Sequence, residues 1–384
     1  MSAAAPIAGS CDPRFTAVRE AFAGNFALHG EIGAAVTVFV GARKMVDLWG
    51  GWADRARTRP WAEHTLVNFF SIGKAIAATC VLRLTQRGLL DLDAPVTRWW
   101  PEFGQAGKSA ITLRQLMSHR GGLPAIGPPM LPAGAMLDWG RMVEALAAQA
   151  PWWGPGTAHG YHTNTFGYLL GEPVRRAAGI TMGTLLREEI AGPLGADVHI
   201  GLPKGEHARV AEFCHPLRPT PAPGEPQPAP KPPATRDELM RACAYNNPQG
   251  VSGGAWVNTE AWRLAEIPST NGHGTARGVA RLYRGLLEGL IDADLLAEAT
   301  TEHAAGRDLI LERPSRFGLG YQLTQAERPL GPNARAFGHF GAGGSLGFCD
   351  PDSGVAFGYV MNDMGPRWQN PRNRALIDAV YRCI

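Results

Sequence analysis

Ser71 and Lys74 are the two residues whose types and spacing most directly indicate chemistry. They stand three positions apart in Ser71-Ile72-Gly73-Lys74, at the start of the apolar segment 74–86. Residues three apart on a helix lie one above the other, so the hydroxyl and the amine share a face. A serine hydroxyl attacks well only when a base takes its proton, and a lysine among apolar neighbours loses its charge through desolvation. The spacing predicts an activated serine at a helix N-terminus, whose dipole favours the negative charge of acyl transfer.

Two alternatives to this interpretation have to be weighed on the residues alone. In the first alternative, Ser71 only caps the helix and Lys74 is a solvated charge, and the spacing would be the same. A second serine, Ser345, stands in Gly343-Gly344-Ser345-Leu346-Gly347 and matches the G-x-S-x-G nucleophile elbow of α/β-hydrolases. That architecture places its histidine after the serine, and no histidine follows Ser345 in the chain. We therefore interpret Ser345 as a strand residue near the site.

The elements that would form a sheet come from both ends of the chain. The pattern predicts a helix over 12–28 and then a hairpin over 34–54 that turns at Gly41 and Ala42. Short strand-like runs follow near the C-terminus at 336–344, 345–350 and 355–363, and 371–383 is expected to close the chain as a helix. These strands are expected to pair with the hairpin in one antiparallel sheet.

The middle of the chain is expected to be mainly helical. Apolar residues recur with 3.6-residue spacing in several segments that end at Gly or Pro. These segments are 74–88, 111–119, 137–149, 166–179 and 182–194. Residues 216–233 are rich in proline, which favours an extended surface excursion, with a flap beside the site as the alternative. We expect an α/β body from residues 1–75 and 250–384 and a mainly helical region from 76–249.

Composition excludes several classes of protein. The 384 residues carry a net charge of only +3, and the basic residues are scattered, so we expect no nucleic-acid partner. The N-terminus lacks the basic and apolar regions of a signal peptide, although Cys11 stands in a lipobox-like AGSC, and no apolar run is long enough to span a membrane. We expect a cytoplasmic protein with no membrane contact. The six cysteines form no C-x-x-C pair and there is no H-E-x-x-H, so we expect reduced thiols, no metal and no cofactor.

The order of motifs resembles the serine β-lactamase and penicillin-binding-protein superfamily, in particular the class C-like branch that includes the family VIII carboxylesterases. The early hairpin comes first, and Ser71-Ile72-Gly73-Lys74 follows it. The later matching segments are 84–103, 111–123, 155–171 and 338–348. The resemblance runs over most of the chain and implies a β-lactamase-like α/β fold, an antiparallel sheet flanked by helices with a helical insertion.

The resemblance also implies further site residues. Tyr161 matches the family's tyrosine, which relays the serine proton, and a nearby lysine ammonium is expected to lower its pKa. His339 and Gly341 match a Lys-Thr-Gly-like motif that binds substrate, and the amide of Ala342 is expected to form an oxyanion hole with that of Ser71. The family pattern is Tyr-x-Asn, and here Thr163 stands where the asparagine belongs. This departure puts the binding of an amide side chain in doubt.

Four other residues receive a structural interpretation. His119 and Arg120 resemble a structural loop of the family, so we expect their side chains to hold the backbone in place rather than to take part in the chemistry. Trp152 and Trp153 are core aromatics by default, although they lie close enough in sequence to Tyr161 to line an acyl pocket.

We therefore expect a serine carboxylesterase that hydrolyses small carboxylic esters through an acyl-Ser71 intermediate, with Lys74 and Tyr161 as a coupled base. A β-lactamase or D-alanyl peptidase, or an acyltransferase, would use the same residues. A non-catalytic binding module that keeps the fold is the alternative from another class.

Overall fold

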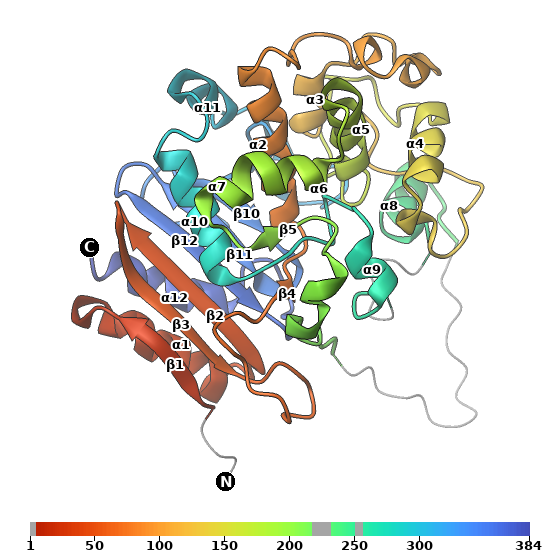
Figure 1. The fold of residues 1–384 in the computed structure, drawn as a ribbon. Helices are drawn as coiled ribbons and strands as arrows, with labels where there is room; N and C mark the ends of the chain where they lie inside the picture. Colours follow the sequence, from red (N-terminus) through yellow and green to blue (C-terminus); the bar gives the residue numbers. More distant parts are fainter. Residues whose placement is uncertain (1–4, 217–231, 250–255) are drawn as a thin grey trace, which may run out of the picture.

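The computed structural model describes residues 5–216, 232–249 and 256–384. Its largest element is a nine-stranded antiparallel sheet in the order β1-β3-β2-β12-β11-β10-β9-β8-β7 (Figure 1). The strands are β1 (Ile7–Cys11), β2 (Gly33–Val40), β3 (Arg43–Gly51), β7 (Ala304–Arg307), β8 (Pro314–Phe317), β9 (Gln322–Leu323), β10 (Phe337–Phe340), β11 (Leu346–Asp350) and β12 (Val355–Met361). The expected sheet built from both chain ends is therefore confirmed.

The two ends of the chain meet where β2 pairs with β12. Val36 lies opposite Tyr359 and Val40 opposite Val355 in this register. The β-branched and apolar residues of β2 and β12 are nearly all buried, which is typical of central strands covered on both faces. The hairpin between β2 and β3 turns at Gly41 and Ala42 as predicted.

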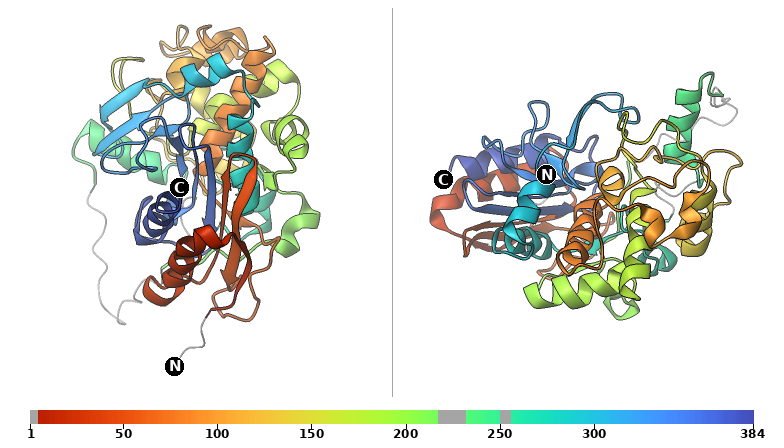
Figure 2. Two further views of the ribbon diagram at one scale, coloured as in Figure 1. Left: turned by 90° about the vertical axis from the view of Figure 1, so that its left-hand side faces the viewer. Right: turned by 90° about the horizontal axis from the view of Figure 1, so that it is seen from above.

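Helices cover the sheet on both sides. Helices α1 (Thr16–Leu28) and α12 (Pro371–Tyr381) pack against each other on one face, and α10 (Ala276–Leu287) packs against β2, β11 and β12 on the other (Figure 2). The remaining helices gather beyond α10 at one end of the sheet, as the view from above shows. A second sheet, β4 (Val67–Asn68), β6 (His273–Gly274) and β5 (Val198–His199), joins this helical part to the body.

All five segments predicted as helices in the middle of the chain are helical. They form α2 (Ile72–Gln86), α3 (Leu113–Met117), α4 (Trp139–Ala148), α5 (Phe166–Ala178) and the run of α6 (Met182–Leu185), a π-helical turn (Leu186–Ala191) and α7 (Gly192–Leu194). Helices α8 (Arg236–Asn246), α9 (Glu260–Leu264) and α11 (Ala293–Ala299) complete the set. The proline-rich excursion expected at 216–233 lies almost entirely outside the described residues.

Sequence patterns did not predict strands β1 and β4 to β9 or helices α8 to α11 as individual elements. Strand β1 includes Cys11, so the lipobox-like AGSC belongs to the edge of the sheet. These strands are short or largely exposed, and therefore lack the alternation of buried and exposed residues that marks a half-buried strand. All six cysteines are free, and four of them are buried. Within the described ranges no helix is both long and apolar enough to cross a membrane.

Candidate active site

Ser71 stands at the N-terminus of α2, directly before Ile72. The preceding residue, Phe70, has φ +52°, a left-handed conformation that is strained for a bulky side chain and typical of functional turns. Gly73 is required because a Cβ there would lie 2.2 Å from the carbonyl oxygen of Pro268. The turn therefore holds Ser71 at the helix end and lets the 268–270 loop approach the helix backbone.

The Lys74 amine lies beside the Ser71 hydroxyl, as the spacing predicted. Its Nζ is 3.2 Å from Ser71 Oγ and also donates to the carbonyl oxygens of Thr163 at 2.7 Å and Ser269 at 2.9 Å. The side chain is fully buried. Burial lowers the pKa of the Lys74 amine well below the ordinary value of a lysine, because the charged form is poorly solvated there. This arrangement provides a base within reach of the hydroxyl.

Tyr161 also packs beside Lys74. The Lys74 amine is 4.7 Å from the centre of the Tyr161 ring, and the tyrosine is buried. Its hydroxyl makes no hydrogen bond of standard geometry among the described residues, although the Ser71 hydroxyl is close enough to act toward a lower pKa. Burial outweighs this effect and raises the pKa of Tyr161 well above the usual value of a phenol. The expected lowering by a lysine ammonium is therefore wrong, because burial disfavours both the ammonium and the phenolate.

Asp308 holds Tyr161 in place and was not singled out by sequence reasoning. One oxygen of this buried carboxylate accepts hydrogen bonds from the backbone amides of Tyr161 at 3.0 Å and of Ile310 and Leu311 at 2.9 Å. Its other oxygen accepts from Ser315 Oγ at 3.0 Å, and this hydroxyl lies 2.9 Å from His159 Nε2. The carboxylate thus ties the tyrosine segment to the β7–β8 hairpin.

His119 has the structural role expected of it. Its Nδ1 accepts a hydrogen bond from the His162 amide at 3.1 Å, and its ring packs 5.0 Å from that of Tyr161. Arg120 donates to the carbonyl oxygen of Gly156, which precedes Tyr161 in the same segment of chain. Both residues therefore fix the backbone around Tyr161.

Thr163 contributes its backbone to the site, because its carbonyl oxygen accepts from Lys74. The neighbouring Asn164 is buried and its amide donates to the Ala244 carbonyl oxygen of α8 at 3.2 Å. The carbonyl oxygens of Thr163 and Ser269 thus hold the lysine amine, and the Asn164 side chain braces α8.

His339, Gly341 and Ala342 lie at the end of β10, next to the nucleophile turn. A Cβ on Gly341 would lie 2.2 Å from the Phe69 carbonyl oxygen and 2.1 Å from Ser345 Oγ, so only glycine allows this approach. His339 Nδ1 lies 2.6 Å from the Phe340 carbonyl oxygen, and burial lowers the pKa of His339 to about 3. The imidazole is therefore neutral near pH 7. The structure brings these residues to Ser71, and their roles in binding stay predictions.

Ser345 has a structural part in the same junction. It is fully buried, and its Oγ donates to the Phe69 carbonyl oxygen at 2.9 Å. This bond fastens the turn between β10 and β11 to the segment before Ser71. A hydroxyl that donates in this way agrees with the interpretation of Ser345 as a strand-end residue.

An aromatic group surrounds Tyr161 on its remaining sides. Trp368, which sequence reasoning did not single out, packs edge-on at 5.0 Å from the Tyr161 ring, and Phe317 stacks at 5.9 Å. Trp152 and Trp153 pack against the same buried cluster. The site is therefore enclosed by apolar and aromatic side chains, which strengthen electrostatic interactions inside it.

Comparison with known proteins agrees with this geometry. The family model described as Beta-lactamase matches residues 18–382. The chain belongs to the beta-lactamase family. It is 35% identical over 378 residues to Esterase/beta-lactamase LipL of Mycobacterium tuberculosis, which covers 92% of this chain and 82% of that protein. Esterase EstB of Burkholderia gladioli is 28% identical, with 86% of each chain covered.

Solved structures of the family share the whole fold. A family VIII carboxylesterase superposes with a TM-score of 0.89 at 39% identity and covers 99% of this chain and 100% of that one. A penicillin-binding protein homologue from Caulobacter crescentus superposes with a TM-score of 0.88 at 42% identity, with the same coverage. The β-lactamase-like fold expected from the sequence is thereby confirmed.

Proposed function

We propose that this beta-lactamase family member is a serine carboxylesterase that hydrolyses small carboxylic esters through an acyl-Ser71 intermediate. The observation that carries the proposal is the 3.2 Å contact between the buried Lys74 amine and the Ser71 hydroxyl. Support comes from the names of the relatives, two of which are esterases, and from the likeness to a family VIII carboxylesterase.

In the acylation step, the neutral Lys74 amine takes the proton of Ser71 as its Oγ attacks the ester carbonyl carbon. The backbone amides of Ser71 and Ala342 stabilise the negative charge on the carbonyl oxygen, helped by the N-terminus of α2. As the carbon–oxygen bond of the ester breaks, the Tyr161 phenol gives its proton to the leaving alcohol and receives one from the Lys74 ammonium. Because burial raises the pKa of Tyr161, the phenol carries the proton that it gives to the leaving group.

Deacylation repeats these steps with water as the nucleophile. Lys74 takes a proton from the attacking water and gives it to Ser71 Oγ as the bond between Oγ and the acyl carbon breaks, which releases the acid product. An alcohol in place of water would give acyl transfer by the same residues.

The six free cysteines support a cytoplasmic location, where thiols stay reduced.

A β-lactamase activity is the second candidate, and the name of the LipL relative favours it. The uncharged His339 and the threonine at position 163 argue for the ester, because a charged lysine and an asparagine amide would bind a lactam more tightly.

The esterase proposal is tested by the turnover of a short-chain p-nitrophenyl ester by Ser71→Ala and by Ser345→Ala. We expect loss of kcat by about 10⁴-fold or more in Ser71→Ala alone. Full activity of Ser71→Ala would refute the proposal.

A further inference from the structure

Two arginine side chains meet over the indole ring of Trp368. The guanidinium carbon of Arg313 lies 5.0 Å from the ring centre, and that of Arg328 lies 6.0 Å from it. Trp368 itself contacts two residues of the candidate site, with its ring 5.0 Å from that of Tyr161 and 6.5 Å from that of His339. One aromatic side chain therefore connects both arginines with the proposed proton donor.

The arginines come from separate parts of the chain and are held in place. Arg313 directly precedes β8, Arg328 stands between β9 and β10, and Trp368 precedes α12. All three side chains are half-buried. Arg328 donates to the Pro314 carbonyl oxygen at 2.8 Å, which fastens it to the residue after Arg313. Side chains that are already ordered lose less entropy when they bind a ligand.

Neither arginine forms an ion pair with an acidic side chain in the part of the chain that the structure describes. Glu312 lies 3.5 Å from Arg241 instead. The buried Asp308 uses both of its oxygens for hydrogen bonds within the protein. Glu327 is exposed and reaches Arg328 only through its charge. The two positive charges are therefore not matched by a bound carboxylate of the described residues.

Each of the two charges makes the other less favourable. Burial and the nearby charge of Arg313 lower the pKa of Arg328 to about 10, against the opposing charges of Glu327 and Asp308. Arg328 still carries its charge near pH 7, as arginine does in proteins generally. A negatively charged group that binds both guanidinium groups removes this repulsion and gains charge-assisted hydrogen bonds.

Tyr245, at the end of α8, gives a second link between Arg313 and the site. Burial raises the pKa of its phenol, while the Thr163 side chain and the charge of Arg313 act toward a lower value. Both groups therefore lie near the Tyr245 hydroxyl, and the Thr163 carbonyl oxygen accepts from the Lys74 amine. Tyr245 is 41% exposed. These contacts bring Arg313 to a solvent-exposed part of the site.

We infer that Arg313 and Arg328 bind a negatively charged group on the alcohol part of the ester, so that esters with an anionic leaving alcohol are the preferred substrates. The inference rests on the proposed function, in which Tyr161 gives its proton to the leaving alcohol. The alcohol then lies on the side of the site that Tyr161 and Trp368 form. Because the arginines reach Tyr161 through Trp368, the charge belongs at the outer end of the alcohol. A carboxylate next to the scissile bond, as in a β-lactam, is too close to the carbonyl carbon to reach them.

The test is the ratio of kcat/KM for 4-(carboxymethyl)phenyl acetate to that for 4-(carbamoylmethyl)phenyl acetate. These esters differ in the charge at the far end of the leaving phenol, and a methylene group separates that charge from the ring. Wild-type enzyme is expected to prefer the anionic ester by about tenfold. Arg313→Gln and Arg328→Gln should each lower the ratio by about threefold, and the double variant should remove the preference. The single variants carry the test if the double variant folds poorly.

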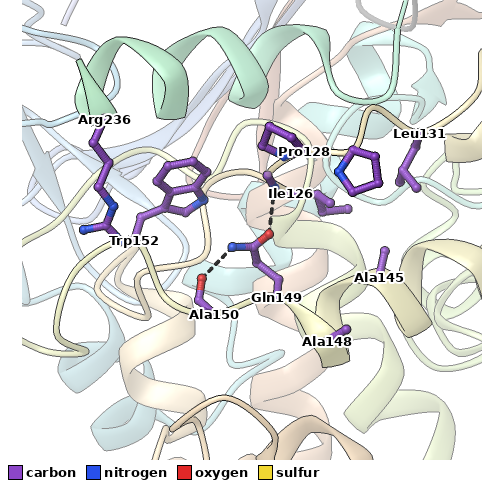
Figure 3. A pocket seen from close by; sticks show the side chains of 11 residues that line it. Ile126, Pro128, Leu131, Ala145, Ala148, Gln149, Ala150, Trp152 and Arg236 are labelled. Atoms are coloured by element: carbon purple, nitrogen blue, oxygen red, sulfur yellow. Dashed lines mark hydrogen bonds between the residues drawn. The ribbon is translucent and has the colours of Figure 1, made fainter. Parts of the chain in front are cut away.

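Arg236→Gln is the matched control. Arg236 also stacks on a tryptophan, with its guanidinium carbon 5.5 Å from the Trp152 ring centre. This contact lies at a cavity of about 430 Å³ between the loop at residues 126–131, α4 and the start of α8, away from Trp368 (Figure 3). The substitution removes the same charge and the same kind of contact, so the ratio should stay as in the wild type.

Three results would each overturn the inference. They are equal kcat/KM for the two esters in the wild type, a wild-type ratio in both single variants, and an equal fall of the ratio in Arg236→Gln. Raised salt gives a further check, because it screens charges that solvent reaches. The wild-type ratio should fall as the salt concentration rises, and a ratio that does not respond to salt would contradict recognition by charge.

A binding measurement separates this inference from the proposed function. Calorimetry on Ser71→Ala with the two product alcohols, 4-hydroxyphenylacetate and 4-hydroxyphenylacetamide, needs no turnover. We expect the anion to bind more tightly than the amide, and the two arginine substitutions together to weaken its binding by about tenfold. No advantage of the anion, or unchanged binding without the arginines, would contradict the inference. Arginine-dependent binding of the anion by an enzyme that hydrolyses no ester would contradict only the esterase mechanism.

Discussion

The carboxylate of Asp308 accepts a 3.0 Å hydrogen bond from the backbone amide of Tyr161, although 147 residues separate them in the sequence. The same oxygen accepts two further amides, so one buried group sets the position of the tyrosine backbone. Displacement of a reacting group by about 1 Å can cost about 10²-fold in rate. Tyr161 is therefore expected to work only while Asp308 holds it.

Replacing Asp308 by alanine should lower kcat by about 10²-fold with little change in KM, because this carboxylate is buried and both its oxygens bond to the protein. The matched control is Asp350→Ala, which removes a buried carboxylate bonded to Asn333, Ser353 and Tyr381 and sharing no partner with the site. In the Tyr161→Phe background, Asp308→Ala should cause no further loss of kcat. A full additional loss in the double variant would show that Asp308 does not act through Tyr161.

Asp308 also shows why part of the site was not predictable. Ser71 and Lys74 are three residues apart, so helix geometry alone brings them together. The amide of Tyr161 and the carboxylate of Asp308 meet only when the β7–β8 hairpin packs against the tyrosine segment, and no local pattern records that contact. The carbonyl oxygens of Thr163 and Ser269 escaped prediction for another reason, since a backbone acceptor leaves no trace in the residue type.

The central strands and the helices of the middle region were predictable because their apolar spacing is regular. Strands β8 and β9 have four and two residues, too few for a periodicity to appear. The direction of the Tyr161 pKa shift was predicted wrongly because the sequence does not show burial. A neighbouring lysine lowers the pKa of a phenol only while it is charged, and Lys74 is buried as deeply as Tyr161.

Lys74→Arg should lose most of the activity. Arginine keeps a positive charge but does not release a proton at ordinary pH, so it cannot act as the base for Ser71. The measurement is kcat on a short-chain p-nitrophenyl ester, with circular dichroism to confirm folding. Retention of more than about a tenth of the wild-type kcat in a folded variant would exclude proton transfer by Lys74.

Activity should rise with pH through the pKa of Lys74 and then reach a plateau. Lys74 works in its neutral form, and burial lowers its pKa, so the neutral amine forms at a lower pH than in an exposed lysine. His339 and His162, each with a pKa of about 3, stay neutral over this range and add no step. A profile of kcat/KM for an uncharged ester checks the direction. A fall in activity as the pH rises from about 6 to 8 would contradict a neutral lysine base.

Esters should be better substrates than β-lactams. The neutral His339 gives up a charge-assisted hydrogen bond to the lactam carboxylate, and Thr163 cannot bind the side-chain amide as asparagine would. Poorly paired polar groups cost about 1 to 3 kcal/mol each, so the two losses together reach about 10²-fold in kcat/KM. The comparison uses a short-chain p-nitrophenyl ester and a chromogenic cephalosporin on one preparation. Equal or greater efficiency on the cephalosporin would favour the β-lactamase alternative.

Labelling with a serine-directed phosphonate ester tests the identity of the nucleophile most directly. The reagent phosphonylates the hydroxyl that a neighbouring base activates, and mass spectrometry of the digested protein then locates the modified peptide. The structure predicts one label per chain, on Ser71, with loss of activity in proportion to labelling and no label in Lys74→Arg. A label on Ser345, or complete inactivation with Ser71 unmodified, would contradict the mechanism.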